Sequence, residues 1–194
     1  VVTEHHHQWL GKELDELRLA YREVRLFSGV EIFLAEGYDL VAISAEPIHF
    51  ERRIPFAEFL QANAALREEM FLFVAHPFRY VDTMTEALRE ILAGVDGIEM
   101  NSINIMKGQW ETQNGRYLPL QWKMYAAARE EYGLLPMYNT DAHHTRAVGT
   151  IASMVTTEHL PRTGRELVDI LKGAAAKEYQ DAKLVKQALN ADLL

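Results

Sequence analysis

Hydrophobic residues along the chain follow two alternating patterns. Short apolar runs of strand length recur, and between them lie stretches in which hydrophobic residues return every three or four positions. The apolar runs predict strands over residues 25–34, 40–44, 70–75, 97–100, 134–138 and 151–155, after a first short one at 1–3. The other stretches predict helices over residues 9–24, 55–69, 83–93, 119–132, 163–172 and 177–193. Strands that alternate with helices and are apolar almost throughout predict a mostly parallel sheet covered on both faces.

Local signals mark the ends of several of these helices. Pro55 suits a first helical turn, Gly94 and Gly133 suit the position after a last turn, and Thr163 with Glu166 forms a capping box. Residues 102–118 form a longer excursion between a strand and a helix. No repeat, low-complexity tract or linker interrupts the pattern, so the sequence predicts a single domain over residues 1–194.

Composition narrows the classes of function. The net charge of −8 argues against a broad nucleic-acid-binding surface, but it permits a small phosphorylated substrate, because a bound cation can invert the local field. The absence of cysteine excludes disulfides, thiolate zinc sites and a cysteine nucleophile. The apolar runs are too short to cross a bilayer and no signal peptide is visible, so no membrane partner and a cytoplasmic location are expected.

Metal-ligating residue types follow one predicted strand after another. They are His5, Glu31, His76, Glu99, Asp141 and His143. The carboxyl ends of strands in α/β folds face a common site, so we expect His5, Glu31, His76, Asp141 and His143 to converge. Imidazole and carboxylate ligands without cysteine suit zinc, manganese or iron. A cluster of such divalent ions lowers the pKa of a bridging water and clamps a phosphoryl group.

The same residues lie in five short motifs that together resemble a known family. The motifs are Thr3-Glu4-His5, Gly29-Val30-Glu31, Ala75-His76-Pro77, Gly97-Ile98-Glu99-Met100-Asn101 and Thr140-Asp141-Ala142-His143. In this order they resemble the T-D-H, G-x-E, H-P, G-x-E-x-N and S-D-A-H motifs of PHP (polymerase and histidinol phosphatase) domains. Val148-Gly149 and the segment around residues 163–173 resemble the closing pattern of that family. The likeness spans nearly the whole chain.

The resemblance implies a distorted (βα)7 TIM-like barrel that holds up to three divalent metal ions and hydrolyses phosphoesters. The metal ligands that it implies are His5, Glu31, His76, Asp141 and His143. For hydrolysis of this kind we expect Asp141 to take part in catalysis and a side chain such as His143 or His7 to protonate the leaving oxygen. Arg79 is the best cationic candidate for a substrate phosphate, although a solvated loop arginine fits equally well, and Asn101 is a candidate substrate contact.

Two departures from the family pattern bear on the metal count. The first motif of the family, an H-x-H on the opening strand, would lie just upstream of Val1, so we expect an N-terminally incomplete domain whose opening strand is missing. Many members also place a histidine after the strand that matches residues 40–44. This chain has Ala45-Glu46-Pro47 there, with His49 slightly further on, so either His49 bends back into the site or one metal position is weakened.

The sequence therefore predicts a metal-dependent phosphoesterase that acts on a phosphomonoester or small nucleotide-type phosphoester by metal-activated water. The alternative is a catalytically degenerate PHP-like module that binds metal or ligand, or serves as a scaffold, without turnover. Amide hydrolysis is a third interpretation, but amidohydrolases typically use a lysine at a strand end and no lysine here follows a convincing strand. The substrate, the identity of the metal and the oligomeric state stay open.

Overall fold

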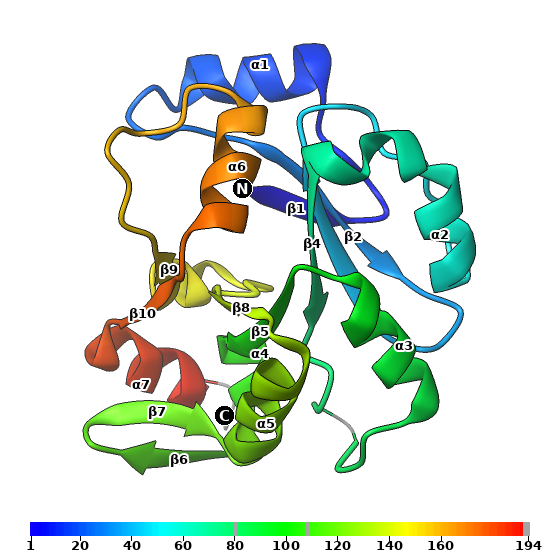
Figure 1. Cartoon of the computed structure of the whole chain (residues 1–194). Coiled ribbons are helices and arrows are strands. Elements are labelled where there is room, and N and C mark those ends of the chain that lie inside the picture. The colour runs from blue at the N-terminus through cyan, green and yellow to red at the C-terminus, as the bar shows by residue number, and fades with distance from the viewer. Residues whose placement is uncertain (80, 108, 192–194) are drawn as a thin grey trace.

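The computed structural model describes residues 1–79, 81–107 and 109–191, and it is built around one open sheet (Figure 1). The sheet has six strands in the order β1-β2-β3-β4-β5-β8. Their bounds are Val2–His5, Ser28–Phe33, Asp39–Ser44, Met70–Ala75, Gly97–Asn101 and Leu135–Tyr138. Two antiparallel pairs lie apart from this sheet: β6 (Trp110–Gln113) with β7 (Arg116–Pro119), and β9 (Ile151–Met154) with β10 (Lys177–Gln180).

Helices cover the sheet and its lower end in the view of Figure 1. The α-helices are α1 (Gly11–Ala20), α2 (Phe56–Ala62), α3 (Glu86–Gly94), α4 (Ile103–Met106), α5 (Trp122–Tyr132), α6 (Gly164–Gly173) and α7 (Ala182–Ala191). Two 3-10 segments are η1 (Ala64–Glu69) and η2 (Thr145–Ala147). Gly133 ends α5 in the left-handed conformation, and the Thr163 hydroxyl accepts from the Glu166 amide at the start of α6. Within the described residues, no helix is long and apolar enough to cross a membrane.

The expected distorted (βα)7 barrel is wrong: the six strands form an open, mixed sheet among the residues that the structure describes. Strand β1 pairs parallel with β2, and β5 pairs parallel with both β4 and β8, but β3 runs antiparallel to both of its neighbours. The reason is the short turn over residues 34–38, since a connection of that length joins antiparallel strands and leaves no room for a crossover helix. Strands β9 and β10 pair with each other and do not close the sheet, so β1 and β8 are its edges.

Two predicted segments also differ from the structure. The predicted helix over 177–193 begins with strand β10, because Asp181 caps the helix by accepting from the amides of Lys183 and Leu184, and its residues 192 and 193 lie outside the described residues. The predicted helix over 55–69 is divided at Asn63 into α2 and η1. The Asn63 side chain bonds the backbone of His49 in both directions, so it ties this helix to the preceding loop.

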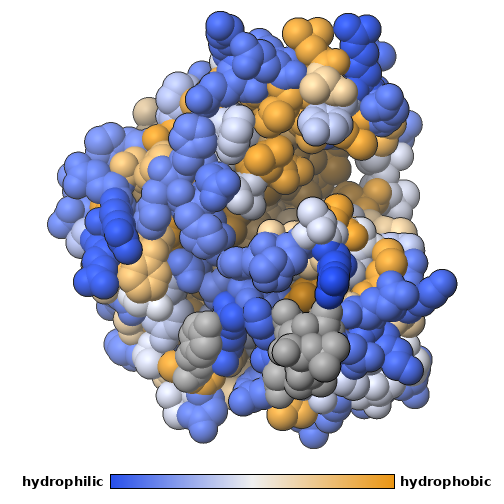
Figure 2. All heavy atoms as spheres, turned by 180° about the vertical axis from the view of Figure 1, so that it is seen from behind, coloured by the Kyte–Doolittle hydropathy of each residue, from blue (hydrophilic) through white to orange (hydrophobic). Residues whose placement is uncertain are grey.

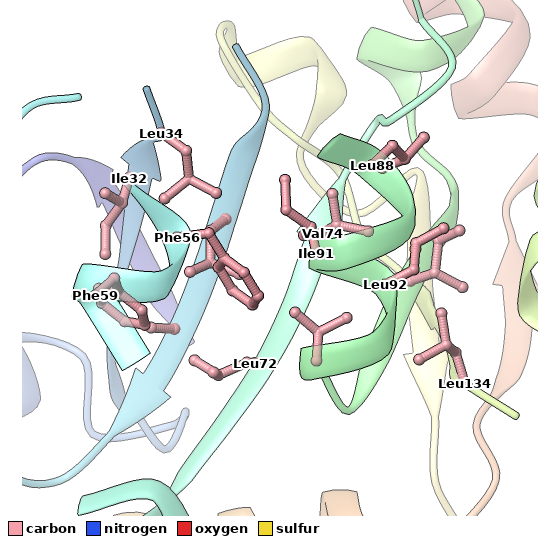
Figure 3. Close-up of a cluster of buried hydrophobic side chains, with 14 of the residues drawn as sticks. Ile32, Leu34, Phe56, Phe59, Leu72, Val74, Leu88, Ile91, Leu92 and Leu134 are labelled. Atoms are coloured by element: carbon pink, nitrogen blue, oxygen red, sulfur yellow. The ribbon is translucent and has the colours of Figure 1, made fainter. Parts of the chain in front are cut away.

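The core lies on both faces of the sheet, which explains the uninterrupted apolar runs. Within β4, Leu72 and Val74 point to the larger cluster beneath α2, α3 and α5, part of which Figure 3 shows. Phe71 and Phe73 point to the opposite face, where α6 packs with Val168. A third cluster joins α4, η2 and α7 through residues such as Ile103, Ala147 and Ala188.

An ion pair beside the first residue of β5 holds the two central strands β4 and β5 in register. Arg67 donates to both oxygens of Asp96 at 2.8 and 3.0 Å, and Asp96 accepts from the Leu72 amide at 2.8 Å. These bonds join η1, β4 and the residue that precedes β5. Strands β4 and β5 are therefore fixed relative to each other. His76 directly follows β4 and Glu99 lies in β5.

Candidate metal centre

The candidate ligands lie at one end of the sheet because of strand direction. His5 ends β1 and lies in register with Glu31 of β2, and His76 directly follows β4. Strand β3 runs the other way, so its first residue, Asp39, lies at the same end, in register with Ala75. Asp141 follows β8, the parallel neighbour of β5.

The imidazole of His76 is the centre of this group. Its Nε2 lies 3.5 Å from Glu31 Oε1, 3.8 Å from Asp39 Oδ2 and 3.9 Å from Asp141 Oδ2. The other Glu31 oxygen lies 3.4 Å from Nε2 of His5. One ligand atom from each of Glu31, Asp39 and His76 fits within a mutual separation of 4.8 Å. These side chains are largely buried, with exposed fractions between 10% and 23%.

These separations suit donors that share a cation better than donors that bond to each other. Donors about 2.1 Å from one tetrahedral ion lie about 3.4 Å apart, whereas N–H···O hydrogen bonds measure about 2.7–3.2 Å. The contacts of His76 with Glu31, Asp39 and Asp141 all exceed the hydrogen-bond range. Asp141 Oδ2 is buried and has no hydrogen-bond partner among the described residues. The donor set therefore fits a divalent metal ion, which would satisfy this oxygen.

The pKa values in this group reflect four carboxylates around the imidazole of His76. They belong to Glu31, Asp39, Glu99 and Asp141. Burial alone would lower the pKa of His76, but the carboxylates of Glu31, Glu99 and Asp141 raise it to about 9. Burial raises the pKa of Glu99 to about 7 and also raises that of Asp39. Burial would raise the pKa of Glu31 too, but the imidazoles of His76 and His5 lower it. The excess negative charge is what a divalent cation would neutralise.

Two of the candidate ligands have strained backbones. His76 has φ 31° and Asp141 has φ 42°, a region that non-glycine residues rarely adopt and that costs about 1–3 kcal/mol per residue. Neighbouring polar groups hold both residues there. Glu99 Oε2 accepts from the His76 amide at 2.7 Å, and Asn139 Oδ1 accepts from the Asp141 amide at 2.8 Å. Glu99 thus orients a candidate ligand from a fully buried position.

His5 and His143 form the exposed side of the cluster. Each side chain is about half exposed, and their rings lie 6.0 Å apart in an edge-to-face arrangement. His143 Nδ1 lies 3.5 Å from Asp141 Oδ1 and 3.2 Å from the Asp141 carbonyl oxygen. The Glu4 carboxylate accepts from the His5 amide and lies beside its ring. The structure therefore brings together the five predicted ligands, with the two exposed histidines open to solvent.

Other predicted site residues lie outside this cluster. His7 pairs with Glu13 of α1 at 3.2 Å, and no contact among the described residues joins it to the candidate ligands. Asn101 is buried and donates to the Tyr117 carbonyl and to Glu178, which occupies the amide nitrogen that a substrate would need. His49 is exposed, and Asn63 holds its backbone, so it does not bend back into the cluster.

Arg79 stays a candidate for substrate binding that the geometry does not test directly. Its amide donates to the His76 carbonyl and closes the turn after β4. Its positive charge acts on the hydroxyl of the buried Tyr125 on α5. The side chain is therefore near the cluster along the chain, and its charge also faces α5.

Asp39 is the candidate ligand that the sequence interpretation missed. Asp39 lies in the gap between the predicted strands 25–34 and 40–44, and the candidate ligands are residues at or after the ends of strands. The available signal was the short connection itself: a hairpin reverses the strand, so the residue that begins β3 lies beside the residues that end β2 and β4.

Two cavities meet at Asp141 and His143. One, of about 740 Å³, lies over the face of the sheet beneath α6, and its lining combines apolar residues such as Val41, Phe73 and Leu171 with Glu31 and Glu99 at one end. Seen from behind, the surface is hollowed over apolar side chains (Figure 2). The other, of about 540 Å³, lies between the end of α4, η2 and α7. The cluster is thus reachable from two sides.

Comparisons with known proteins give a fold relationship only. No protein-family model and no curated protein matches the chain. A solved structure, the crystal structure of PsfC from Pseudomonas syringae PB-5123, is similar with a TM-score of 0.58 and 16% sequence identity. The alignment covers 85% of this chain and 64% of the length of PsfC. This likeness supports the α/β arrangement of the open sheet and its helices, and it says nothing about activity.

Proposed function

We propose that this chain is a metal-dependent phosphoesterase of the PHP kind that hydrolyses a phosphomonoester or a small nucleotide-type phosphoester. The observation that carries the proposal is the group of Glu31, Asp39 and His76, whose ligand atoms lie within 4.8 Å of one another beside the unpartnered oxygen of Asp141. Imidazole and carboxylate donors of this kind suit zinc, manganese or iron. The order of the five motifs along the chain supports the same choice.

The residues divide into a buried holding set and an exposed reactive set. Glu31, Asp39, His76 and Asp141 would hold the cation, and His5 lies on the exposed side where it could complete the coordination. When bound, a divalent ion supplies a Lewis acid for the phosphoryl oxygens and activates water. His143 is oriented by the Asp141 carbonyl and carboxylate, and its exposed ring faces both cavities, where it would give a proton to the leaving oxygen.

The test is reconstitution of chelator-treated protein with zinc, manganese or iron, followed by measurement of metal content and of phosphomonoester and nucleotide hydrolysis. We expect hydrolysis to require metal and to collapse in Asp141→Asn, since asparagine tolerates the backbone of this position but lacks the charge. His159→Ala is the matched control, because His159 is exposed and lies outside the cluster. Metal binding without hydrolysis of any phosphoester would replace this proposal with the non-catalytic metal-binding module, and failure to bind metal would refute both.

A further inference from the structure

The cavity of about 540 Å³ beside the metal cluster carries positive charge in a chain of net charge −8. Lys107 and Arg146 line it together with His143 and His144. Among the described residues that line this cavity, the one carboxylate belongs to Asp141, which is a candidate metal ligand. The cavity therefore favours an anionic group on the side away from the cluster.

The cavity is continuous with the cluster and has a rigid floor. Asp141 and His143 line both this cavity and the larger one that reaches Glu31. Ile103, Ala147 and Ala188 form part of a buried apolar cluster and also line the cavity. A ligand could thus place one group at the cluster, lay an organic spacer over this apolar floor and extend a second group toward the cations. The volume falls within the range of small-molecule sites, about 300–1,000 Å³.

The segment that presents Arg146 is fixed by the backbone. Arg146 lies in η2, where the Ala147 amide donates to the His144 carbonyl and the Thr150 hydroxyl donates to the Ala147 carbonyl. Within the part of the chain that the structure describes, the Arg146 side chain makes no ion pair and is exposed to solvent. Its guanidinium is thus available to an anion, with geometry suited to carboxylate or phosphate oxygens.

We propose that this cavity binds a second anionic group of the substrate, with Arg146 as the cation that selects it. The inference rests on the proposed function and narrows its substrate class to small organic phosphoesters that carry a second negative group at the far end of the molecule. The buried Asn104 side chain, which also lines the cavity, adds an amide for hydrogen bonds to that group or to the spacer.

A matched series of aryl esters tests this selection. Phenyl phosphate has no second anion, 4-carboxyphenyl phosphate adds a carboxylate, and 1,4-phenylene bisphosphate adds a phosphate. We expect the metal-loaded protein to give kcat/KM values at least about tenfold higher for the two doubly anionic esters, since an additional charged hydrogen bond strengthens binding about tenfold or more. Arg146→Gln should bring these ratios close to one. Lys12→Gln is the control, because Lys12 is exposed on α1 and pairs with Glu16.

Binding to the metal-free protein separates the cavity from the chemistry. With inorganic pyrophosphate as the probe in calorimetry, we expect binding to the wild-type protein that Arg146→Gln weakens at least about fivefold and that Lys12→Gln leaves unchanged. Binding of this kind without any hydrolysis would uphold the anion site and overturn the proposed function. Hydrolysis with equal kcat/KM for all three esters, and no effect of Arg146→Gln, would overturn the anion site and uphold the function. Arg146 is exposed, so thermal unfolding of the variant should match the wild type.

Discussion

The protonation of His76 gives the candidate metal centre a pH dependence that can be measured. An imidazole binds metal through a neutral ring nitrogen, so the cation and the proton compete for the same atom. The pKa of His76 in the metal-free protein is raised to about 9 by the surrounding carboxylates. At pH 7 the neutral form is therefore about one part in a hundred, since each pH unit below the pKa is a factor of about ten. At pH 9 it is about one half, so raising the pH from 7 to 9 should tighten metal binding about 50-fold.

Calorimetry can measure both the pH dependence of the metal affinity and the number of protons released when the metal binds. Titration of zinc or manganese into metal-free protein between pH 6.5 and 8.5 should show an affinity that rises by about tenfold per pH unit. Repeating the titration at pH 7.5 in two buffers of different ionisation enthalpy should show about one proton released per metal ion. The variant Glu99→Gln keeps an acceptor for the His76 amide but removes a charge that holds the proton, so both the slope and the proton release should fall.

Two results would refute this reasoning. An affinity that does not change between pH 6.5 and 8.5 would mean that His76 is not a ligand or is already neutral. An affinity that falls with pH would mean that protonated groups hold the ligand, which is inconsistent with a metal centre. The metal affinity of His159→Gln should depend on pH in the same way as that of the wild type. His159 is exposed, and among the described residues it contacts none of the candidate ligands.

The remaining predictions concern the ligand set and the stability of the fold. Asp39→Asn should weaken metal affinity at least about tenfold in the same calorimetry without unfolding the chain, because the carboxylate lies 3.8 Å from His76 Nε2 and is partly exposed. Asp96→Ala should lower the free energy of unfolding in urea by about 2–4 kcal/mol, because it leaves Arg67 and a backbone amide unpaired, whereas Asp15→Ala on exposed α1 should change it by less than about 0.5 kcal/mol. In the metal-free protein, the pKa of His76 is raised from 6.5 in the unfolded chain to about 9, so protonated His76 stabilises the fold fully below pH 6.5 and this stabilisation is lost as the pH rises toward 9. The melting temperature should therefore be lower at pH 9 than at pH 6. A melting temperature that rises over this interval would contradict the expected sign.

The convergence of the candidate ligands could be predicted from the sequence because it depends on local order. Several apolar runs contain or lead into a ligand-type residue, and strand direction then places His5, His76 and Asp141 at a common end of the sheet. The alternation of side chains along a strand adds that Glu31 points to the site face. None of this needs the order of the strands in the sheet.

The closure of the sheet could not be predicted in the same way. Apolar runs indicate that strands are buried on both faces, but they do not say which strands pair. Whether β9 pairs with β8 or with β10 depends on contacts between residues far apart along the chain, such as Ile151 with Gln180. The turn between β6 and β7, by contrast, can be predicted from the local sequence. Asn114-Gly115 is a strong hairpin signal, and it forms the turn between β6 and β7 with both residues at positive φ.

A comparison within the molecule separates a structural polar network from a functional one. At the edge near β7 and β10, Glu178 accepts from Asn101 and Gln180 and forms an ion pair with Arg116, so its charge is balanced by a cation and by two amide donors. Around His76 the balance of charge differs, because four carboxylates face one imidazole.

Such an arrangement destabilises the folded chain when no cation is present, because buried like charges repel and unpaired oxygens are desolvated. The strained backbones of His76 and Asp141 add to this cost, and the buried Glu99 and the partly buried Asn139 hold them in place. A packing role would be met better by apolar side chains of similar volume. The buried carboxylates and the unpaired oxygen weaken the fold at this end of the sheet, but they would coordinate a bound divalent ion. This arrangement favours a metal centre over a structural network.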